Sequence, residues 1–489
     1  MPVNKDFYPI AGSSGAQSTG YTIDQSIRFN DGDNPKLTRT PSSAGNRRTF
    51  TFSSWIKRGI LTTHQTVFGS YINTTNYFMI YFDLDSHSSD NTFRVYEYNG
   101  NVLKLWVYGS QRFRDTSAWY HFVVNVDTTN PIANERVKMY VNGSRITDLT
   151  QNQQPALNYE TYINSTNLQT IGEFYGNYYH LDAYMADIHL LDGYAYGPEF
   201  FGEFDDYDNW IPKEYTGSYG TNGFKIDGRD SSDLGDDESG NGNDYTSSGL
   251  AAHDQVTDTP TNNFCVMNPL ANPGGSTYAE GNLKVTMASG TKKGTYSSFA
   301  IDSGKWYVEG RLTSNNNGSE YAYTGIEDYN SAIGSGQYIG RDTYGYSYDP
   351  ANGAFLHNNS NVVSSLPSVA QGDIIQIAVD LDNNAIYWGK NGTFLNSGNP
   401  ASGASKTGGV SIIAASSQPS GHYHIGHSNG TGSSGYQSEI VWNFGQDGTF
   451  AGGTTAGGNS DGNGIGNFKY SVPSGYLALC TQNLFGSGG

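Results

Sequence analysis

Short segments of alternating apolar and polar residues run through the first half of the chain. Residues 48–58 (RTFTFSSWIKR) place Phe50 and Phe52 on one face and Thr51 and Trp55 on the other. Similar runs follow at 77–85, 93–98, 103–109, 119–127 and 136–143, and Asn, Gly, Asp or Ser fills the breaks. This spacing predicts an antiparallel sandwich or barrel, with a hairpin turn at Asn142-Gly143. No stretch keeps a helical period over three turns.

A second strand-rich region begins near Phe264. Residues 372–395 (GDIIQIAVDLDNNAIYWGKNGTFL) predict two consecutive hairpins, with turns at Asn383-Asn384 and at 390–392. The pattern therefore indicates an all-β protein with two antiparallel β-sandwich (jelly-roll) domains in tandem, at 23–204 and 263–489. We expect an N-terminal attachment arm at 1–22, an acidic Gly/Asn-rich linker at 205–262 and a flexible Gly-rich loop at 446–467.

Composition narrows the class of partner. The net charge is −19 and no basic run is present, which argues against nucleic-acid binding and against docking to anionic membranes. No segment reaches the ~20 apolar residues that span a bilayer, and residues 1–15 lack the apolar core of a signal peptide. The two cysteines, Cys265 and Cys480, leave a reduced pair or one bridge open. The segments that contain the two cysteines, CVMNPL (265–270) and CTQNLF (480–485), resemble each other. We therefore expect them to lie close together and to close the second domain.

Three blocks of residues resemble known families. The segments FTFSSWIKRG, WYHFVVNVD, VKMYVNG and LDAYMADIHLLDGYAYGPEFFGEF make residues 23–204 similar to laminin-G-like and concanavalin-type lectin and glucanase jelly rolls. GDIIQIAVDLDNNAIYWGKNGTF, SGKWYVEGRL, YTGIE and EIVWNFGQ make residues 276–447 similar to SPRY domains. The pairing, with NNFCVMNPL and YSVPSGYLALCTQNL, resembles virion (tail-fibre or decoration) proteins of tailed phages. The resemblance implies adhesion or particle decoration rather than catalysis.

The motifs of hydrolytic enzymes are missing from the sequence. A glycosidase needs two carboxylates, and the Glu-x-Asp-x-x-Glu run of hydrolases with this fold does not occur. There is no nucleophile elbow, His-Glu-x-x-His or Cys-x-x-Cys. We therefore expect no enzymatic activity.

Aromatic residues supply the candidate binding sites. Sugars stack on aromatic rings and hydrogen-bond to polar groups at rims. The ligand-binding candidates are Tyr175, Tyr178, Tyr179 and His180 in a Gly/Asn-rich loop, Tyr321, Tyr323, Tyr344, Tyr346 and Tyr348 on strands, and His422 and His424. Trp106 and Tyr108 form a shorter stripe. Core positions explain the strand aromatics, Trp106 included, equally well, and His422 and His424 fit solvent-facing positions better than a metal site.

Calcium is the one cofactor that the sequence leaves open. Lectin-like folds often hold Ca²⁺ at the rim, and hard cations prefer carboxylate oxygens. The candidate ligands are Asp83, Asp85, Asp90 and Asp182, with a solvated acidic loop as the stronger interpretation for each.

The sequence thus predicts a non-enzymatic phage virion protein that mediates host attachment by binding cell-surface glycan. Its partners would be a host polysaccharide or protein receptor and other virion proteins through the arm, and we expect a homo-oligomer, with no membrane insertion. One alternative is a capsid or tail decoration protein that contacts only virion subunits, and another is a polysaccharide depolymerase.

Overall fold

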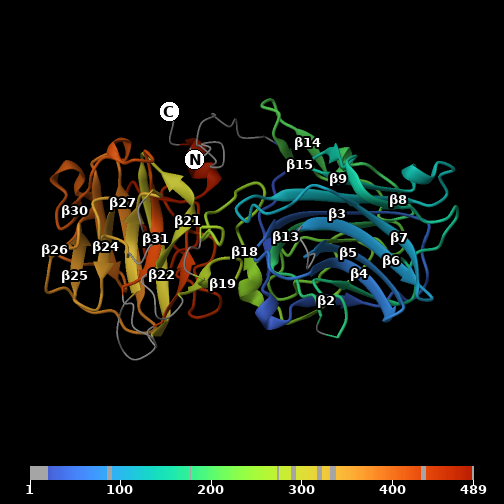
Figure 1. The fold of residues 1–489 in the computed structure, drawn as a ribbon, viewed down its shortest axis with the longest axis horizontal. Helices are drawn as coiled ribbons and strands as arrows, with labels where there is room; N and C mark the ends of the chain where they lie inside the picture. Colours follow the sequence, from blue (N-terminus) through green and yellow to red (C-terminus); the bar gives the residue numbers. More distant parts are fainter. Residues whose placement is uncertain are drawn as a thin grey trace. The chain divides into compact units, whose positions relative to one another are not determined.

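The computed structural model describes residues 20–84, 91–176, 178–271, 275–287, 293–315, 322–330, 338–430 and 437–486. The described chain divides between two compact units, with the boundary between Asn262 and Asn263. Each unit contains two large β-sheets, as the labels in Figure 1 show. The all-β class with antiparallel sandwich domains is therefore confirmed. No helix in the described ranges has the length and apolar character needed to cross a membrane.

The first unit contains two eight-stranded sheets. The β3 sheet has the order β10 (Ser144–Arg145), β9 (Val137–Val141), β8 (Tyr120–Asp127), β3 (Thr49–Arg58), β13 (Ala183–Asp192), β1 (Ser26–Phe29) and β18 (Gln255–Val256), and β16 (Phe224–Ile226) also pairs with β13. The β5 sheet has the order β11 (Leu149–Gln153), β7 (Val102–Gly109), β6 (Thr92–Asn99), β5 (Asn76–Asp83), β4 (Gln65–Asn73), β12 (Leu168–Ile171), β2 (Lys36–Arg39) and β17 (Thr246–Ser248).

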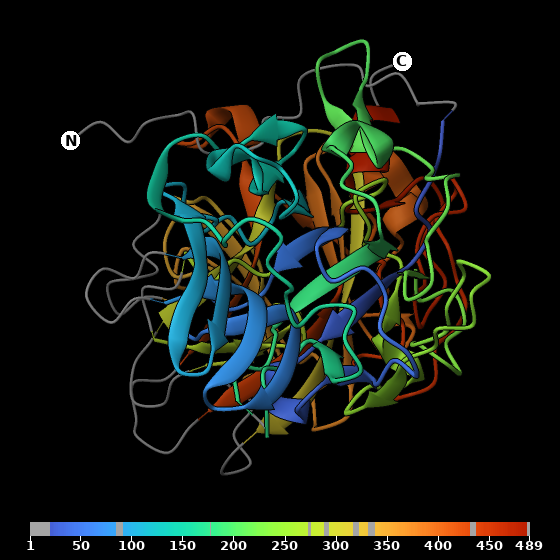
Figure 2. The same cartoon turned by 90° about the vertical axis from the view of Figure 1, so that its right-hand side faces the viewer.

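The core of the first unit lies between these sheets. Phe52 of β3 stacks on Phe68 of β4 at a ring-centroid distance of 5.0 Å, and Phe82 of β5 meets Phe122 of β8 at 5.4 Å. Alternate residues of β5, β6 and β7 enter this core, which is the period of two that the sequence shows. The curved strands of this meander are the blue ribbons in Figure 2.

The predicted turn at Asn142-Gly143 is confirmed. Asn142 has φ 45° and Gly143 has φ 77°, and the turn joins β9 to β10. Positive φ at both central residues is the mark of the type I′ turn. A short hairpin, β14 (Gly202–Phe204) with β15 (Trp210–Pro212), projects from the same unit (Figure 1).

Residues 205–262 are not a free linker. Strands β16, β17 and β18 from this segment pair with β13, β2 and β1, and Phe224 and Tyr245 are buried in the core. The acidic residues of the segment bond to its own backbone: Asp237 accepts from the amides of Lys225 and Asn243. The sequence suggested a linker because the segment contains few apolar residues. Hydrogen bonds from the local backbone to acidic side chains stabilise its loops instead.

The second unit also contains two sheets. The β22 sheet has the order β19 (Thr277–Ala279), β20 (Lys284–Thr286), β32 (Ser438–Asn443), β22 (Lys305–Asn315), β27 (Ile374–Asp380), β28 (Ala385–Lys390) and β29 (Thr393–Phe394), with β30 (Val410–Ser411) on β28 and β33 (Leu477–Ala478) on β22. The β31 sheet has the order β21 (Lys293–Ile301), β31 (Tyr423–Asn429), β23 (Ala322–Glu327), β24 (Gly345–Asp349), β25 (Ala354–His357) and β26 (Ser360–Val363). A short helix, α1 (Thr481–Gly486), follows β33.

Trp388 ties the two sheets of the second unit together. Its indole NH donates to the Thr324 carbonyl at 3.0 Å, and its ring lies 4.5 Å from that of Phe355. The two predicted hairpins are confirmed as β27–β28 and β28–β29. The predicted closure is confirmed as well, because Phe264 bridges to Cys480 and the Cys265 amide donates to the Leu479 carbonyl. Both cysteines are buried, and neither forms a disulfide.

The Gly-rich segment 446–467 is held more firmly than its composition suggested. The Asp447 carboxylate accepts from the amides of Thr449 and Ala451, and the Asp461 carboxylate accepts from Asn463 and Ile465. These bonds fold the segment onto the second unit, so the expectation of a flexible loop is corrected.

Candidate functional site

The outer side of the β5 sheet carries a row of aromatic side chains. Phe78 of β5, Val95 of β6 and Val107 of β7 enter the core, so their strand neighbours point to the opposite side of the sheet. With a residue of β4 they form a surface that we call the aromatic face: Tyr71, Tyr77, Tyr81, Tyr96, Tyr98, Trp106 and Tyr108. Tyr96 and Tyr98 are two residues apart on β6, so alternation places both on this side of the sheet.

The rings of the aromatic face touch one another across three strands. Tyr77 of β5 stacks on Tyr96 and Tyr98 of β6, with ring-centroid distances of 5.9 and 5.7 Å. Tyr96 meets Trp106 of β7 edge-on at 6.0 Å, and Trp106 lies 5.6 Å from Tyr108. The row is therefore a continuous ring surface rather than a set of isolated side chains.

The aromatic face is only partly covered. Tyr77, Tyr96, Tyr98, Trp106 and Tyr108 are half-buried, although they pack against one another. Tyr71 and Tyr81 are buried beneath their neighbours. A contiguous, partly exposed apolar surface of this kind marks interaction sites in soluble proteins.

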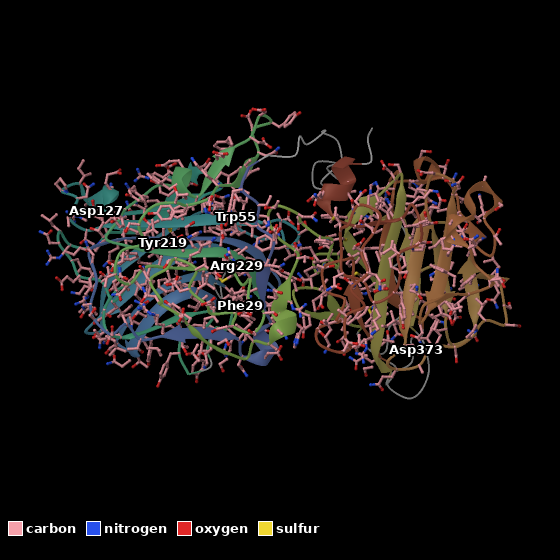
Figure 3. The ribbon with its side chains drawn as sticks, turned by 180° about the vertical axis from the view of Figure 1, so that it is seen from behind. Phe29, Trp55, Asp127, Tyr219, Arg229 and Asp373 are labelled. Carbon is pink, nitrogen blue, oxygen red and sulfur yellow. The ribbon has the colours of Figure 1, made fainter. Side chains whose placement is uncertain are left out.

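The outer side of the β3 sheet is covered by contrast. Trp55 and Tyr184 are buried there in one cluster, and Leu191, Phe201 and Tyr219 in another. Figure 3 labels Trp55 and Tyr219 on this side. The two sheets of the first unit therefore differ, and the β5 sheet is the one with an open aromatic surface.

Charged groups at one border of the aromatic face neutralise each other. Asp83 lies 2.5 Å from the Arg94 guanidinium and 2.5 Å from Nδ1 of His64. The same guanidinium sits over the ring of Tyr108 at 4.0 Å, a cation–π arrangement. Asp83 therefore balances a local cation.

Three tyrosine hydroxyls of the face, those of Tyr77, Tyr81 and Tyr96, stay protonated at neutral pH. Burial raises the pKa of Tyr77 and Tyr96 above the ordinary tyrosine value, and burial together with the Asp83 charge raises the pKa of Tyr81. A protonated phenol can both donate and accept a hydrogen bond. The face thus presents apolar rings with polar hydroxyl tips.

The predicted loop candidates of the first domain lie beside this face. Tyr175 stacks on Tyr71 at 3.7 Å, and Tyr179 meets His64 edge-on at 5.0 Å, so both extend the ring surface. Tyr178 is 64% exposed. His180 is half-buried, and burial lowers its pKa.

The predicted tyrosine site of the second domain is corrected by the structure. Tyr323, Tyr346 and Tyr348 are buried, and Tyr344 is half-buried. Their hydroxyls have internal partners: Tyr323 donates to Asp349, Tyr348 donates to the Pro367 carbonyl, and Tyr346 accepts from the Ile413 amide. Tyr321 lies outside the described residues. Alternation placed Tyr346 and Tyr348 together correctly, but on the core side of β24.

His422, which precedes β31, and His424 within that strand do not share a solvent-facing surface. His424 is buried, and its Nδ1 lies 2.9 Å from the Ser297 carbonyl, whereas His422 is half-buried. Burial lowers the pKa of His424 to about 4. The expected solvent position is therefore wrong for His424, while Tyr423 and Ile425 enter the core as expected.

The calcium candidates are not brought together. Asp83 is bound by Arg94 and His64, and Asp182 is fully buried, with its Oδ1 accepting from the Ile60 amide. Asp85 and Asp90 lie outside the described residues. Within the described ranges, no three acidic, histidine or cysteine side chains form a group that could hold a metal ion.

Comparison with known proteins supports the lectin-like resemblance of the first domain. Residues 30–195 match the model of the concanavalin A-like lectin/glucanases superfamily. A comparison with curated proteins gives no match.

Several solved structures are similar to this chain. The SPRY domain of human HERC1 is 18% identical, with 36% of this chain and 96% of that chain covered and a TM-score of 0.28. A heptameric SAP-like pentraxin from Limulus polyphemus is 16% identical, with coverage of 36% and 78% and a TM-score of 0.25. A Bacteroides ovatus protein described as a candidate carbohydrate-binding protein is 15% identical, with coverage of 47% and 58% and a TM-score of 0.31.

Sequence reasoning missed most of the aromatic face. It identified Trp106 and Tyr108 as a stripe but left Tyr77, Tyr96 and Tyr98 in ordinary strands. The signal was present in part, because Tyr96 follows Val95 and Tyr77 precedes Phe78. Alternation alone does not show which side of the sheet other parts of the chain leave uncovered.

Proposed function

We propose that this chain is a non-enzymatic surface or fibre protein of a phage particle, and that its first domain attaches to host cell-surface glycan through the aromatic face. The observation that carries this proposal is the continuous, half-buried row of rings from Tyr77 to Tyr108 on the outer side of the β5 sheet. The match of residues 30–195 to a superfamily of lectins and glucanases supports it.

Glycan binding suits the chemistry of this surface. The C–H faces of sugar rings pack on aromatic rings, and sugar hydroxyls need polar partners close by. The protonated tyrosine hydroxyls supply such partners, and β11 adds the amides of Gln151 and Gln153, which pair across the strand with Tyr108 and Trp106. Both requirements are therefore met on one side of one sheet.

Hydrolysis is a weaker proposal for the same surface. A glycosidase needs two carboxyl groups at ~5 or ~6.5–9.5 Å on either side of the scissile bond. Asp83 lies in an ion pair with Arg94, and Glu97 points to the core side of β6, where it accepts a hydrogen bond from Tyr159. The two carboxylates thus lie on opposite sides of the sheet.

The virion location rests on the resemblance to phage structural proteins. In this proposal the N-terminal arm attaches the chain to the particle as part of a homo-oligomer, and the chain is made in the host cytoplasm. Tyr21, the first aromatic residue after the segment outside the described ranges, donates to Asp187 of β13 at 3.0 Å. Such a contact anchors the beginning of the described chain to the β3 sheet.

A decoration protein that contacts only virion subunits is the second candidate. The β14–β15 hairpin favours it, because Phe204 and Tyr207 at its tip are about half exposed. Exposed aromatic rings on a projecting hairpin suit a protein partner. This candidate predicts stable assembly without glycan affinity.

A polysaccharide array separates these proposals. The full-length protein is labelled and applied to a panel of purified bacterial capsular, O-antigen and storage polysaccharides, with and without periodate oxidation. Saturable binding that periodate abolishes and Trp106→Ala weakens supports the adhesin. No binding to any polysaccharide, together with co-purification with virion subunits, supports decoration. A fall in polymer length during incubation supports a depolymerase.

A further inference from the structure

We infer that the aromatic face takes an internal stretch of an unbranched polysaccharide laid across strands β4 to β7, rather than the terminal sugar of a glycan. This inference rests on the proposed glycan binding and specifies the ligand of the same surface. It follows from the open shape of the face, from its length across the strands and from the pairing of Asp83 with Arg94 and His64.

The rings form a row that runs across the strands. Tyr71 of β4 is directly opposite Tyr77 of β5, Tyr77 is directly opposite Tyr98 of β6, and Tyr96 is directly opposite Trp106 of β7. Neighbouring strands lie ~4.8 Å apart, so four adjacent strands separate the first ring from the last by roughly 14 Å. One sugar ring can cover only part of such a row, whereas a chain of sugars can cover all of it.

The row is a surface and not a closed pocket. Terminal-sugar recognition needs a cavity that surrounds the last residue of a glycan with hydrogen-bonding groups. The open hollow of about 510 Å³ in the first unit is lined elsewhere, by Arg39, Asn243, Asp244 and neighbouring residues at the β2 and β17 edge of the sheet. The aromatic face contributes none of its residues to that hollow.

Both ends of the row remain accessible. At the β4 end, Tyr175 extends the row and is 47% exposed. At the β7 end, Gln151 and Gln153 of β11 are half-buried. A polymer that continues beyond the bound sugars therefore meets an exposed ring at one end and half-buried amide side chains at the other.

Binding on this face does not require a metal ion. The carboxylate of Asp83 is held by Arg94 and His64 at 2.5 Å each, so both of its oxygens already have a side-chain partner. Stacking is a short-range contact spread over several rings. EDTA is therefore expected to leave the affinity unchanged.

An oligosaccharide length series tests this inference on the full-length protein. The polysaccharide that binds best on the array is partially hydrolysed, and size-fractionated fragments from one sugar to eight are titrated by intrinsic tryptophan fluorescence and calorimetry. We expect affinity to rise several-fold with each added sugar up to about four, and then to level off. Capping the non-reducing end of a long fragment is expected to leave its affinity unchanged.

Matched variants locate the ligand on the row. Trp106→Ala and Tyr77→Ala are each expected to weaken long fragments about fivefold while affecting single sugars little. Trp106→Phe, which keeps a ring, should recover most of the loss. Tyr207→Ala, on the β14–β15 hairpin, is the control, with no change expected.

Other outcomes overturn the inference in distinguishable ways. If one sugar binds as tightly as the polymer, or if capping abolishes binding, the site recognises glycan ends and only the ligand assignment fails. The same holds if Tyr178→Ala abolishes binding while Trp106→Ala does not. If no polysaccharide binds at all, the proposed glycan binding itself fails. Thermal melting of each variant shows whether it is folded, and the ring-retaining Trp106→Phe keeps the test valid if Trp106→Ala is unfolded.

Discussion

A fully buried ion pair connects residues 205–262 to the first sandwich. Nζ of Lys57 in β3 lies 2.7 Å from Oδ2 of Asp258, and both side chains have no solvent exposure. The other carboxylate oxygen, Oδ1, accepts from the indole NH of Trp119 at 3.1 Å. The segment therefore contributes to the stability of the domain and is not a tether.

The perturbation is Lys57→Met, which keeps the length of the side chain and removes its charge. The Asp258 carboxylate then remains buried and keeps the hydrogen bond from the Trp119 indole NH. Removing one partner of a buried ion pair costs about 3–5 kcal/mol, a large part of a typical ~5–15 kcal/mol total. We expect the first domain of the variant to unfold at a much lower urea concentration than that of the wild type.

A double-mutant cycle separates the ion pair from general damage. Asp258→Asn keeps an acceptor for Trp119 and removes the charge, so Lys57→Met/Asp258→Asn should be more stable than Lys57→Met alone. We expect a coupling free energy of about 2 kcal/mol or more between the two positions. The control is Arg48→Met, because Arg48 and Glu160 form an exposed ion pair, for which at most about 1 kcal/mol is expected.

Urea denaturation followed by tryptophan fluorescence measures the free energy of unfolding, and hydrogen exchange with mass spectrometry assigns the change to peptides of the first unit. A loss below 1 kcal/mol for Lys57→Met, or a cycle without coupling, would refute the reasoning. The segment would then behave as the linker that its composition suggested.

Three further predictions concern titration and turn geometry. Burial raises the pKa of Glu97 to about 8, so its contribution to the stability of the fold is greatest below pH 4.5 and is lost as the pH rises to 8. By order of magnitude, this loss of stability is about 4 kcal/mol. Glu97→Gln should therefore flatten the fall in melting temperature between pH 5 and 8. Burial lowers the pKa of His427 to about 3, so its contribution to the stability of the fold is present above pH 6.5 and is lost as the pH falls towards 3. His427→Gln should therefore flatten the acid side of the plot of melting temperature against pH. An unchanged plot would contradict the burial of an uncharged His427. Gly143→Ala should lower the melting temperature more than Gly100→Ala. Both residues have positive φ, but only at position 143 does the added Cβ meet the Trp210 ring, at 2.6 Å. Equal losses would show that the ring does not lie there.

The functional surface could be predicted only in part. Alternation in 93–98 and 103–109 identifies the residues that share a side of each strand, which is why Trp106 and Tyr108 were grouped from the sequence. The same rule grouped Tyr346 and Tyr348, yet those two are buried and Tyr96 and Trp106 are half exposed. A period of two gives the grouping but not the side, since tyrosine suits both a core and a binding surface.

The sequence by itself determined the elements of this protein. The period of two predicted most of the strands, and the positive-φ preference of Asn and Gly predicted the turn at Asn142-Gly143. The lack of a helical period indicated the all-β class. These are local properties, set by backbone sterics and by which neighbours must avoid water.

Only the tertiary structure decided which surface is open and which segment is structural. The outer side of the β3 sheet is covered because distant residues such as Tyr219 and Val256 pack onto it, whereas the rings on the β5 sheet stay half exposed. The burial of Asp258 beside Lys57 also depends on residues far apart in the chain. Burial is a property of the assembled domain, because the groups that cover a side chain come from other parts of the chain, and no local pattern encodes them.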